Sequence, residues 1–552
     1  MLQRFMPTEQ AKTSAKIRVK KIFECASHFL HRYRLGVISG VLIGMNYIPF
    51  YPWAEFFCLS PLFLFWWTRA QNKRQTFVAG WLTQFLLNLI GFHWIAYTAI
   101  EFGHFPVWGG ILSLLGFAAI AHLYFPVAGV IAHWLIHRFQ LKGKSSLFVY
   151  ALTFALLDRL APKIFPWHFG YPWLWAGWPG AQFTDVIGFE GLNVISILVN
   201  ALMTWSIVEG LLKYAKARRK PWLIASGAAA IVLAVNLAGV GREVPWKTTD
   251  AELNVLAIQG NIGNFDKLMA ELRSEFGAPV VKKYIDLSRQ AISAHPEAHL
   301  MIWPETAFPT LLDRPSMNQR LAMQVRSFLR ETHMPLLTGA YSHDGRSRSV
   351  YNGIFFLDEN GEAPFEPYRK SILLVFGETF PFSEYIDYMG KLFPNQGSFA
   401  HGSGPKVFRL PLARASDQSV ALGPQICYEG LYPWFSAELS REGAQIFTNV
   451  TNDSWFWRPF EPNQHLYMTL ARSIEFRRPL FRSTNTGITT AILASGEILE
   501  KSPIGEEWTG VFRIPYLKNP EHTFYERYGA AWPWILLSTL VLVLVLGKRF
   551  KV

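Results

Sequence analysis

The chain has 552 residues, of which 50% are hydrophobic and 17% charged, and its formal net charge is +13. This length is too great for one ordinary domain, and the composition is typical of a membrane protein. The positive charge lies mainly in an N-terminal arm and in short runs between apolar stretches, where topology signals belong. No nucleic-acid motif accompanies it, so no nucleic-acid partner is expected.

The apolar stretches predict a protein that crosses the membrane about eight times, since one crossing takes about 20 residues. The first follows a basic arm, but no small-residue cleavage site comes after it, which indicates an uncleaved anchor. Loops rich in Lys and Arg alternate with loops that have neither, so the positive-inside rule places both termini in the cytoplasm. The expected spans lie near 35–53, 54–70, 76–99, 107–136, 146–162, 187–212, 221–241 and 529–547.

The segment before the last span has a different texture, charged and interrupted by turn residues, which predicts one soluble α/β domain. Strand-like runs are expected at 253–258, 300–303, 420–422 and 445–450, and helices at 266–275, 280–294 and 318–331. The expected domains are a basic cytoplasmic arm (1–34), a seven-span membrane domain (35–241), an extracytoplasmic catalytic domain (242–527), and a C-terminal span with a cytoplasmic tail (528–552).

The chain has three cysteines, and only Cys427 lies in the soluble domain; Cys25 is in the basic arm and Cys58 in an apolar span. A single exported cysteine has no internal disulfide partner there. It could be a small buried hydrophobe. However, Cys427 closes the apolar run 420–426 where a turn begins, a position that exposes a nucleophile beside backbone N–H groups.

A thiol nucleophile needs a base and a group that stabilises negative charge. Glu305 ends another apolar strand, beside Trp303 and Phe308, and is the candidate base; the alternative is a Glu that starts a helix after Pro304. Lys370 precedes an apolar stretch and is the candidate partner for an oxyanion. Taken alone, such a lysine is usually a solvated surface charge.

These residues and their neighbours resemble a known family. Trp-Pro-Glu-Thr-Ala-Phe-Pro (303–309), Tyr-Arg-Lys (368–370) with Phe-Gly-Glu (376–378), and Ile-Cys-Tyr-Glu (426–429) look like the Glu-Lys-Cys triad of the nitrilase superfamily. With the expected spans, nearly the whole chain resembles the apolipoprotein N-acyltransferases. Further similar segments are 158–159, 165–167, 170–171, 259–262, 452–456 and 478–487. The chain departs from the family pattern at Leu268, Ile372 and Val375, in loops expected near the site.

The resemblance implies an α-β-β-α sandwich inserted before the last span, and a two-step acyl transfer at the cytoplasmic (inner) membrane of a bacterium, with the catalytic domain on the periplasmic face. Glu305 takes the proton of Cys427, whose thiolate attacks a membrane phospholipid while Lys370 holds the oxyanion. The resulting thioester then passes its acyl chain to the α-amine of a diacylated apolipoprotein. No metal or organic cofactor is expected, and the protein is expected to be a monomer.

Three further residues are expected to support the site. Glu378 would hold Lys370 charged and fix its direction, and Tyr428 adjoins the nucleophile. Glu429 would orient the turn or receive the ammonium of the acceptor, or it is a solvated turn residue. In the membrane part, Asp158 and Arg159 are candidates for ion pairing or for headgroup contacts.

Two other functions remain open at this stage. A membrane-anchored amidase or nitrilase would use the same triad and pass its thioester to water, but it would need only one anchor. A transporter or binding protein whose exported domain has lost activity is disfavoured by the presence of Glu305, Lys370 and Cys427.

Overall fold

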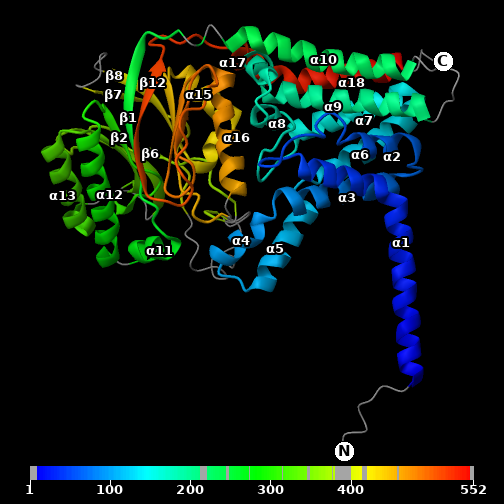
Figure 1. The fold of residues 1–552 in the computed structure, drawn as a ribbon, viewed down its shortest axis with the longest axis horizontal. Helices are drawn as coiled ribbons and strands as arrows, with labels where there is room; N and C mark the ends of the chain where they lie inside the picture. The colour runs from blue at the N-terminus through cyan, green and yellow to red at the C-terminus, as the bar shows by residue number, and fades with distance from the viewer. Residues whose placement is uncertain are drawn as a thin grey trace, which may run out of the picture.

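The chain folds into a helical half and an α/β half that lie side by side (Figure 1). The basic loop 213–219, the tail 548–552 and Phe376 of the expected motif lie outside the described residues. The computed structural model describes residues 9–211, 220–243, 246, 248–272, 274–313, 315–344, 349–375, 377–379, 399–412, 419–456 and 459–547.

The helical half contains long apolar helices and several short ones. Helix α9 has a break at Gly188, whose φ is 69°. The ring of Tyr525 packs so closely against Gly188 that a Cβ would lie 2.2 Å from a ring carbon, which explains a glycine there. The helices are α1 (Glu9–Met45), α2 (Ser60–Thr68), α3 (Lys73–Gly91), α4 (Trp94–Glu101), α5 (Val107–Ile120), α6 (Tyr124–Phe139), α7 (Lys144–Leu160), α8 (Tyr171–Trp175), η2 (Pro179–Phe183), α9 (Thr184–Leu211), α10 (Lys220–Glu243), α17 (Phe524–Tyr528), η5 (Gly529–Ala531) and α18 (Trp532–Leu546).

By length and hydropathy, four helical stretches among the described residues are able to cross a membrane. A fifth arises if α3 and α4, which are bent by 61°, count as one span. The expected number of about eight spans therefore stays a prediction. The four stretches are Val107–Phe139, Pro179–Gly210, Pro221–Arg242 and Phe524–Leu546.

The other expected spans do not match the helix bounds as closely. The stretch near 35–53 is helical only as far as Met45, and the stretch near 54–70 only over Ser60–Thr68. Pro49 and Pro52 lie in the gap, and proline disfavours a continuous helix. The stretch near 146–162 forms α7, which has 17 residues. Helix α1 begins at Glu9, so the expected arm at 1–34 and the first apolar segment share one helix.

The α/β half contains two stacked sheets covered by helices on both outer faces (Figure 1). The expected strands and helices of this region are confirmed within a few residues. Its elements are β1 (Ala251–Gln259), α11 (Asn264–Leu272), α12 (Ser274–Ala294), β2 (Leu300–Ile302), β3 (Phe308–Leu311), α13 (Pro315–Thr332), β4 (Leu336–His343), β5 (Val350–Leu357), β6 (Tyr368–Arg369), β7 (Phe408–Pro411), β8 (Ser419–Ile426), η4 (Cys427–Leu431), α15 (Pro433–Arg441), β9 (Ile446–Thr451), α16 (Phe460–Phe476), β10 (Leu480–Thr484), β11 (Thr490–Ile492) and β12 (Trp508–Tyr516).

The strand order brings the ends of several strands to one place between the sheets. The first sheet has the order β12-β1-β2-β4-β5-β6, with β3 paired to β4, and the second has the order β11-β10-β9-β8-β7. β1 pairs in parallel with β2, and β2 with β4; likewise β8 pairs with β9, and β9 with β10, which places the carboxyl ends of these strands at shared edges. Helices α12 and α13 cover the first sheet, and α15 and α16 the second (Figure 1). This is the α-β-β-α arrangement.

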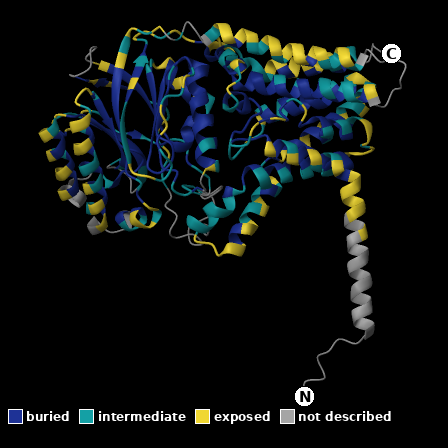
Figure 2. Ribbon diagram, viewed as in Figure 1, coloured by how far each residue is buried: buried dark blue, intermediate teal, exposed yellow. Residues whose placement is uncertain are grey.

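The two halves share a continuous apolar core (Figure 2). One cluster of buried side chains runs from Trp66 and Trp167 in the helical half to Leu466 and Phe481 in the α/β half. Polar contacts fix the junction as well. Gln464 of α16 donates to the carbonyls of Ile48 and Gly91, both at 2.8 Å. The α/β domain is therefore held in one orientation on the helices.

Buried ion pairs add to this junction. Asp185 of α9 binds Arg242 of α10 at 2.7 Å and Arg477 at 3.0 Å. Glu475 of α16 accepts a hydrogen bond from the backbone N–H of Phe189 at 2.9 Å. Breaking such a pair on one side leaves an uncompensated buried charge, which disfavours separation of the two halves.

Asp158 and Arg159 both form ion pairs, although not with each other. Asp158 is buried and binds Lys163 at 2.7 Å and His168 at 3.1 Å. Arg159 binds Glu190 at 2.8 Å. Pairing, the first of the two expected roles, is what the structure shows for each of them.

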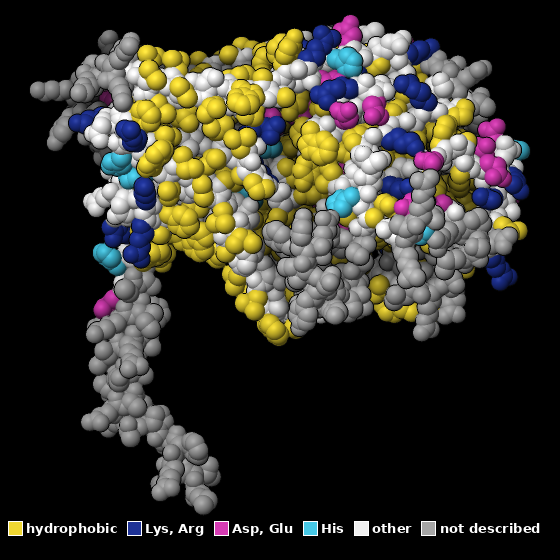
Figure 3. All heavy atoms as spheres, turned by 180° about the vertical axis from the view of Figure 1, so that it is seen from behind, with side chains coloured by type: hydrophobic (Ala, Val, Ile, Leu, Met, Phe, Trp, Pro, Cys, Tyr) yellow, Lys and Arg dark blue, Asp and Glu magenta, His cyan; other side chains and the backbone are white. Residues whose placement is uncertain are grey.

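Exposed apolar side chains gather on the helical half, whereas charged side chains cover the α/β half (Figure 3). The exposed set includes Trp108, Leu112, Trp222, Leu237 and Trp534. A contiguous apolar surface of this kind suits contact with lipid chains. Its position next to the α/β half places the latter at the edge of the apolar region.

Candidate active site

Cys427 lies directly after β8 and opens the short helix η4. Its φ is 51°, a left-handed conformation that is uncommon for a residue other than glycine. Such strain is found at functional sites, where the surrounding structure holds it. Cys427 is buried, with 8% of the residue exposed. The expected location at the end of a strand is thus confirmed.

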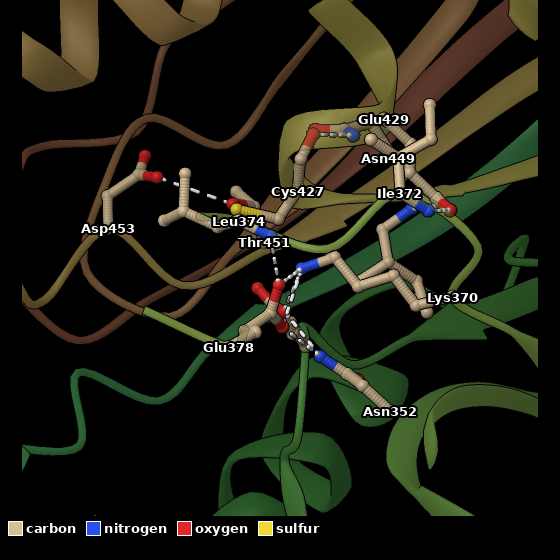
Figure 4. A network of polar contacts seen from close by, with 12 residues as sticks. Asn352, Lys370, Ile372, Leu374, Glu378, Cys427, Glu429, Asn449, Thr451 and Asp453 are labelled. Carbon is tan, nitrogen blue, oxygen red and sulfur yellow. Dashed lines mark hydrogen bonds and ion pairs between the residues drawn. The ribbon is translucent and has the colours of Figure 1, made fainter. Parts of the chain in front are cut away.

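Glu305 and Lys370 come from the other sheet. Glu305 lies in the turn after β2, and Lys370 follows β6 immediately. The ammonium of Lys370 is 3.4 Å from the Glu305 carboxylate and 2.8 Å from that of Glu378. Figure 4 shows the ammonium directed at Glu378, with the sulfur of Cys427 on the facing side of the network. All three expected residues therefore meet at one site.

The electrostatics of the site favour a neutral thiol and a charged lysine. Burial raises the pKa of the Cys427 thiol well above its usual value, and the charge of Glu305 raises it further, while Lys370 opposes both. Burial lowers the pKa of Lys370, but Glu378 and Glu305 outweigh it, so that this pKa is raised. The resting thiol needs a base, and the ammonium stays available to an oxyanion.

Glu378 and Asn352 bind two of the candidate catalytic groups, Lys370 and Glu305. Glu378 accepts from the ammonium of Lys370 and, at 2.9 Å, from the backbone N–H of Leu374. Asn352 donates to Glu305 at 2.7 Å and accepts, through its backbone carbonyl, from the N–H of Lys370 at 2.8 Å. The geometry matches the positioning role expected for Glu378. Asn352 was not expected, because nothing in its sequence context marks it.

Glu429 is completely buried and joins the nucleophile's turn to the lysine's loop. Its carboxylate accepts from the backbone N–H groups of Ile426 at 2.8 Å and Ser371 at 2.7 Å, and from the hydroxyl of Tyr368 at 2.6 Å. Of the expected alternatives, this favours orientation of the turn. The alternative interpretation, a solvated turn residue, is wrong because Glu429 is buried. The carboxylate is also inaccessible to an acceptor's ammonium.

Tyr428 is part of a pocket at the junction of the two halves. The ring of Phe165, from the helical half, stands edge-on to the ring of Tyr428 at 6.0 Å between centroids. The wall of this pocket includes Cys427. The other lining residues are Phe92, Trp94, Leu374, Leu431, Phe456, Glu461, Gln464, His465 and Met468.

A buried polar network behind the nucleophile also escaped the sequence analysis. Asn449 donates to the carbonyl of Cys427 at 3.1 Å and accepts from Arg482 at 2.7 Å. Arg482 also binds Asp453 at 2.9 Å, and Asp453 contacts His465 at 3.0 Å. The segments 452–456 and 478–487 were noted only for their resemblance, and the network explains their composition.

Asp453, Glu461 and His465 bring their ligand atoms within 4.8 Å of one another, a spacing that metal sites share. The sequence gave no sign of such a cluster. Arg482 lies 2.9 Å from Asp453 and 3.1 Å from Nδ1 of His465. Because this guanidinium already supplies the positive charge, the donor set does not fit a metal ion.

The three departures from the family pattern have modest roles here. Ile372 acts through its backbone N–H, which donates to Glu429 at 3.2 Å. Val375 pairs with Thr379 in an isolated bridge, and Leu268 is a half-buried residue of α11.

Comparisons with known proteins define the class first. Residues 257–515 match the carbon-nitrogen hydrolase family, and residues 39–202 match the apolipoprotein N-acyltransferase N-terminal domain. The chain is therefore a membrane-associated enzyme with a nitrilase-like domain. It is 44% identical to an apolipoprotein N-acyltransferase of Bdellovibrio bacteriovorus over 96% of both chains. The chain belongs to the apolipoprotein N-acyltransferase family.

One further relative and two solved structures are also similar to this chain. An apolipoprotein N-acyltransferase of Geobacter metallireducens is 28% identical over 94% of this chain and 96% of its own. Among solved structures, a carbon-nitrogen hydrolase from Helicobacter pylori has 14% identity and a TM-score of 0.35, covering 52% of this chain and 94% of its own. An amidase from Nesterenkonia sp. has 14% identity and a TM-score of 0.35, covering 51% and 97%.

Proposed function

We propose that this membrane acyltransferase takes an acyl chain from a membrane phospholipid, carries it as a thioester on Cys427, and transfers it to the α-amine of the N-terminal diacylglyceryl-cysteine of a lipoprotein. The observation that carries this proposal is the position of Cys427. It faces the Glu305–Lys370 pair on one side and a pocket walled by residues of the helical half on the other. A thiol in that place reaches substrates whose chains stay in lipid.

In the first half-reaction Glu305 takes the proton of Cys427, and the thiolate attacks the ester carbonyl of the phospholipid. Lys370 stabilises the oxyanion, since it stays charged beside Glu378. The C–O bond breaks, and the leaving alkoxide of the lysophospholipid receives the proton held by Glu305. This explains why burial of a neutral thiol is compatible with catalysis.

In the second half-reaction the free amine of the acceptor attacks the thioester. The C–S bond breaks, Cys427 recovers a proton through Glu305, and the lipoprotein leaves with three acyl chains. No cofactor takes part in either step as proposed, because thiolate and thioester chemistry suffices.

We further propose eight spans, cytoplasmic termini, and a catalytic domain (242–527) on the periplasmic face of the inner membrane, with the enzyme acting as a monomer. The charge pattern of the loops supports this orientation. Cysteine-accessibility labelling of Glu438→Cys, on the exposed surface of α15, tests it: an impermeant reagent added to whole spheroplasts labels this position if the domain is periplasmic, and fails if it is cytoplasmic.

The alternative function is a membrane-anchored amidase that passes its thioester to water. Purified acyl-enzyme, freed of phospholipid, separates the two. Addition of a diacylated lipopeptide should move the acyl chain to the peptide's N-terminus far faster than buffer releases it as free acid. Equal release of free acid with and without lipopeptide would favour the hydrolase.

A further inference from the structure

The pocket beside Cys427 contains an acid that the proposed mechanism does not use. Among the described residues that line this pocket, Glu461 is the only carboxylate. It lies in the first turn of α16, and its side chain is about 6% exposed. Glu305 and Glu378, by contrast, are absent from the pocket wall and are engaged with Lys370. Glu461 is thus the acid that a molecule in the pocket meets beside the thiol.

The carboxylate of Glu461 has an atom without a protein partner. Its Oε1 lies 3.6 Å from Nδ1 of His465, and its buried Oε2 has no hydrogen-bond partner among the described residues. Gln464 does not bind this oxygen, because its amide oxygen accepts from Trp94 at 3.0 Å and its amide nitrogen donates to two backbone carbonyls. A buried polar atom of this kind is costly unless a ligand completes it.

The charged groups around Glu461 do not fully balance its negative charge when it is ionised. Arg482 and Asp453 form a pair with each other. His465 does not supply a second positive charge, because burial and Arg482 both lower its pKa. Burial and the charge of Asp453 raise the pKa of Glu461 well above its usual value. Arg482 opposes these two effects but is shared with Asp453, so a further positive charge next to Oε2 would stabilise an ionised Glu461.

The acceptor brings such a charge. An α-amino group has a pKa of about 8, so it arrives mostly as an ammonium, and it attacks a thioester only after losing a proton. Transfer of that proton to a carboxylate with an ordinary pKa has a strongly unfavourable free energy. When the pKa of the carboxylate is raised, the free energy of the transfer is closer to zero.

We propose that Glu461 is the ammonium-binding subsite for the acceptor and removes its first proton in the second half-reaction. This inference rests on the proposed function. The ammonium binds Oε2 of Glu461 and gives up one proton to it, and the amine then attacks the thioester carbonyl. The second N–H proton passes through Glu305 to the sulfur of Cys427 as the C–S bond breaks. Glu461 returns its proton to water when the product leaves.

The test compares Glu461→Gln with wild-type enzyme in the two half-reactions separately. Glu461→Gln keeps the shape of the side chain and removes the base. Acyl-enzyme formation from phospholipid should stay within about twofold of wild type, and transfer to a diacylated lipopeptide should slow by about 100-fold, the lower end of the range for one general base. Glu438→Gln, an exposed change on α15, is the matched control and should alter neither step.

Cleavage of the thioester by hydroxylamine is a second measurement. It distinguishes loss of a base from a structural disturbance of the site. It is uncharged near neutral pH and needs no base to lose a proton before attack, so it should cleave the thioesters of wild type and Glu461→Gln at equal rates. Without this base, the transfer rate of Glu461→Gln should follow the fraction of lipopeptide with a free amine and rise through about pH 8, whereas wild type should already transfer efficiently below that pH. Among the described residues, the charged or titratable groups near Glu461 are Tyr47, Cys427, Tyr428, Asp453, His465 and Arg482.

Three outcomes would overturn the proposal. Equal slowing of the lipopeptide and hydroxylamine reactions in Glu461→Gln would show a structural role, and an unchanged lipopeptide rate would show that another group takes the proton. Loss of wild-type transfer on addition of a chelator would show that Glu461 binds a metal instead. Failure of the wild-type enzyme to form any acyl-enzyme would contradict the proposed function, which is a separate result.

Discussion

Substitution of Glu429 distinguishes clearly between a residue that binds substrate and a residue that positions other groups of the site. Replacement by Gln removes the charge and turns one oxygen into a donor. Both oxygens accept backbone N–H groups, from Ile426 at 2.8 Å and from Ser371 at 2.7 Å. A glutamine can serve only one of them as an acceptor, so the other N–H is left buried without a partner, which costs about 1–3 kcal/mol.

The remaining contacts weaken too, because hydrogen bonds to a charged group are worth about 1.5–3 kcal/mol and neutral ones about 1 kcal/mol. We expect Glu429→Gln to lower the free energy of unfolding by about 2–5 kcal/mol. The same change lets the turn of Cys427 shift relative to the loop of Lys370. A misplacement of reacting groups by about 1 Å can lower a reaction rate by about 100-fold, so acyl-enzyme formation should slow by about that factor.

The assay is single-turnover acylation from phospholipid, followed by intact mass, with thermal unfolding in detergent measured on the same samples. Glu438→Gln is the matched control, since Glu438 is exposed and belongs to the helix that follows the turn. The reasoning is refuted if Glu429→Gln acylates at the wild-type rate and fails only in transfer to the amine. That result would return Glu429 to the role of an acceptor contact.

Other changes separate the members of the site. Glu305→Gln should block acyl-enzyme formation, and normal thioester accumulation in it would reveal another base. Lys370→Ala should slow acylation by more than about 100-fold in the same single-turnover assay, as on removal of one oxyanion donor. Glu378→Gln should slow both half-reactions together, and a loss confined to one of them would contradict a positioning role. Because burial raises the pKa of Cys427, its alkylation by iodoacetamide should climb with pH beyond 9 without reaching a plateau below it. A plateau near neutral pH would indicate a resting thiolate. Cys58→Ser should leave turnover unchanged.

The sequence was most informative where local patterns decide the structure. Apolar runs such as 253–258 became strands because their side chains fill the space between sheets and helices. The triad was found because each member sits in a short motif at a strand's end. Burial of Glu429 was missed, since its partner Tyr368 lies 61 residues away and only the fold brings them together.

Long-range packing explains the rest of what was missed. Trp94 meets Gln464 across 370 residues, and this contact builds the wall of the pocket. Similarly, Trp66 in the short helix α2 is buried among other helices rather than facing lipid. Hydropathy alone treats such a residue as part of a span, because it does not distinguish burial in protein from burial in the bilayer.

In the proposed mechanism Cys427 carries the acyl chain between the two substrates. Incubation of the purified enzyme with phospholipid alone, followed by intact mass and peptide mapping, tests this role. We expect an adduct of one acyl chain on Cys427 that hydroxylamine removes and that Cys427→Ala does not form. An unmodified enzyme that still acylates a lipopeptide when both substrates are present, or an adduct on another residue, would contradict it.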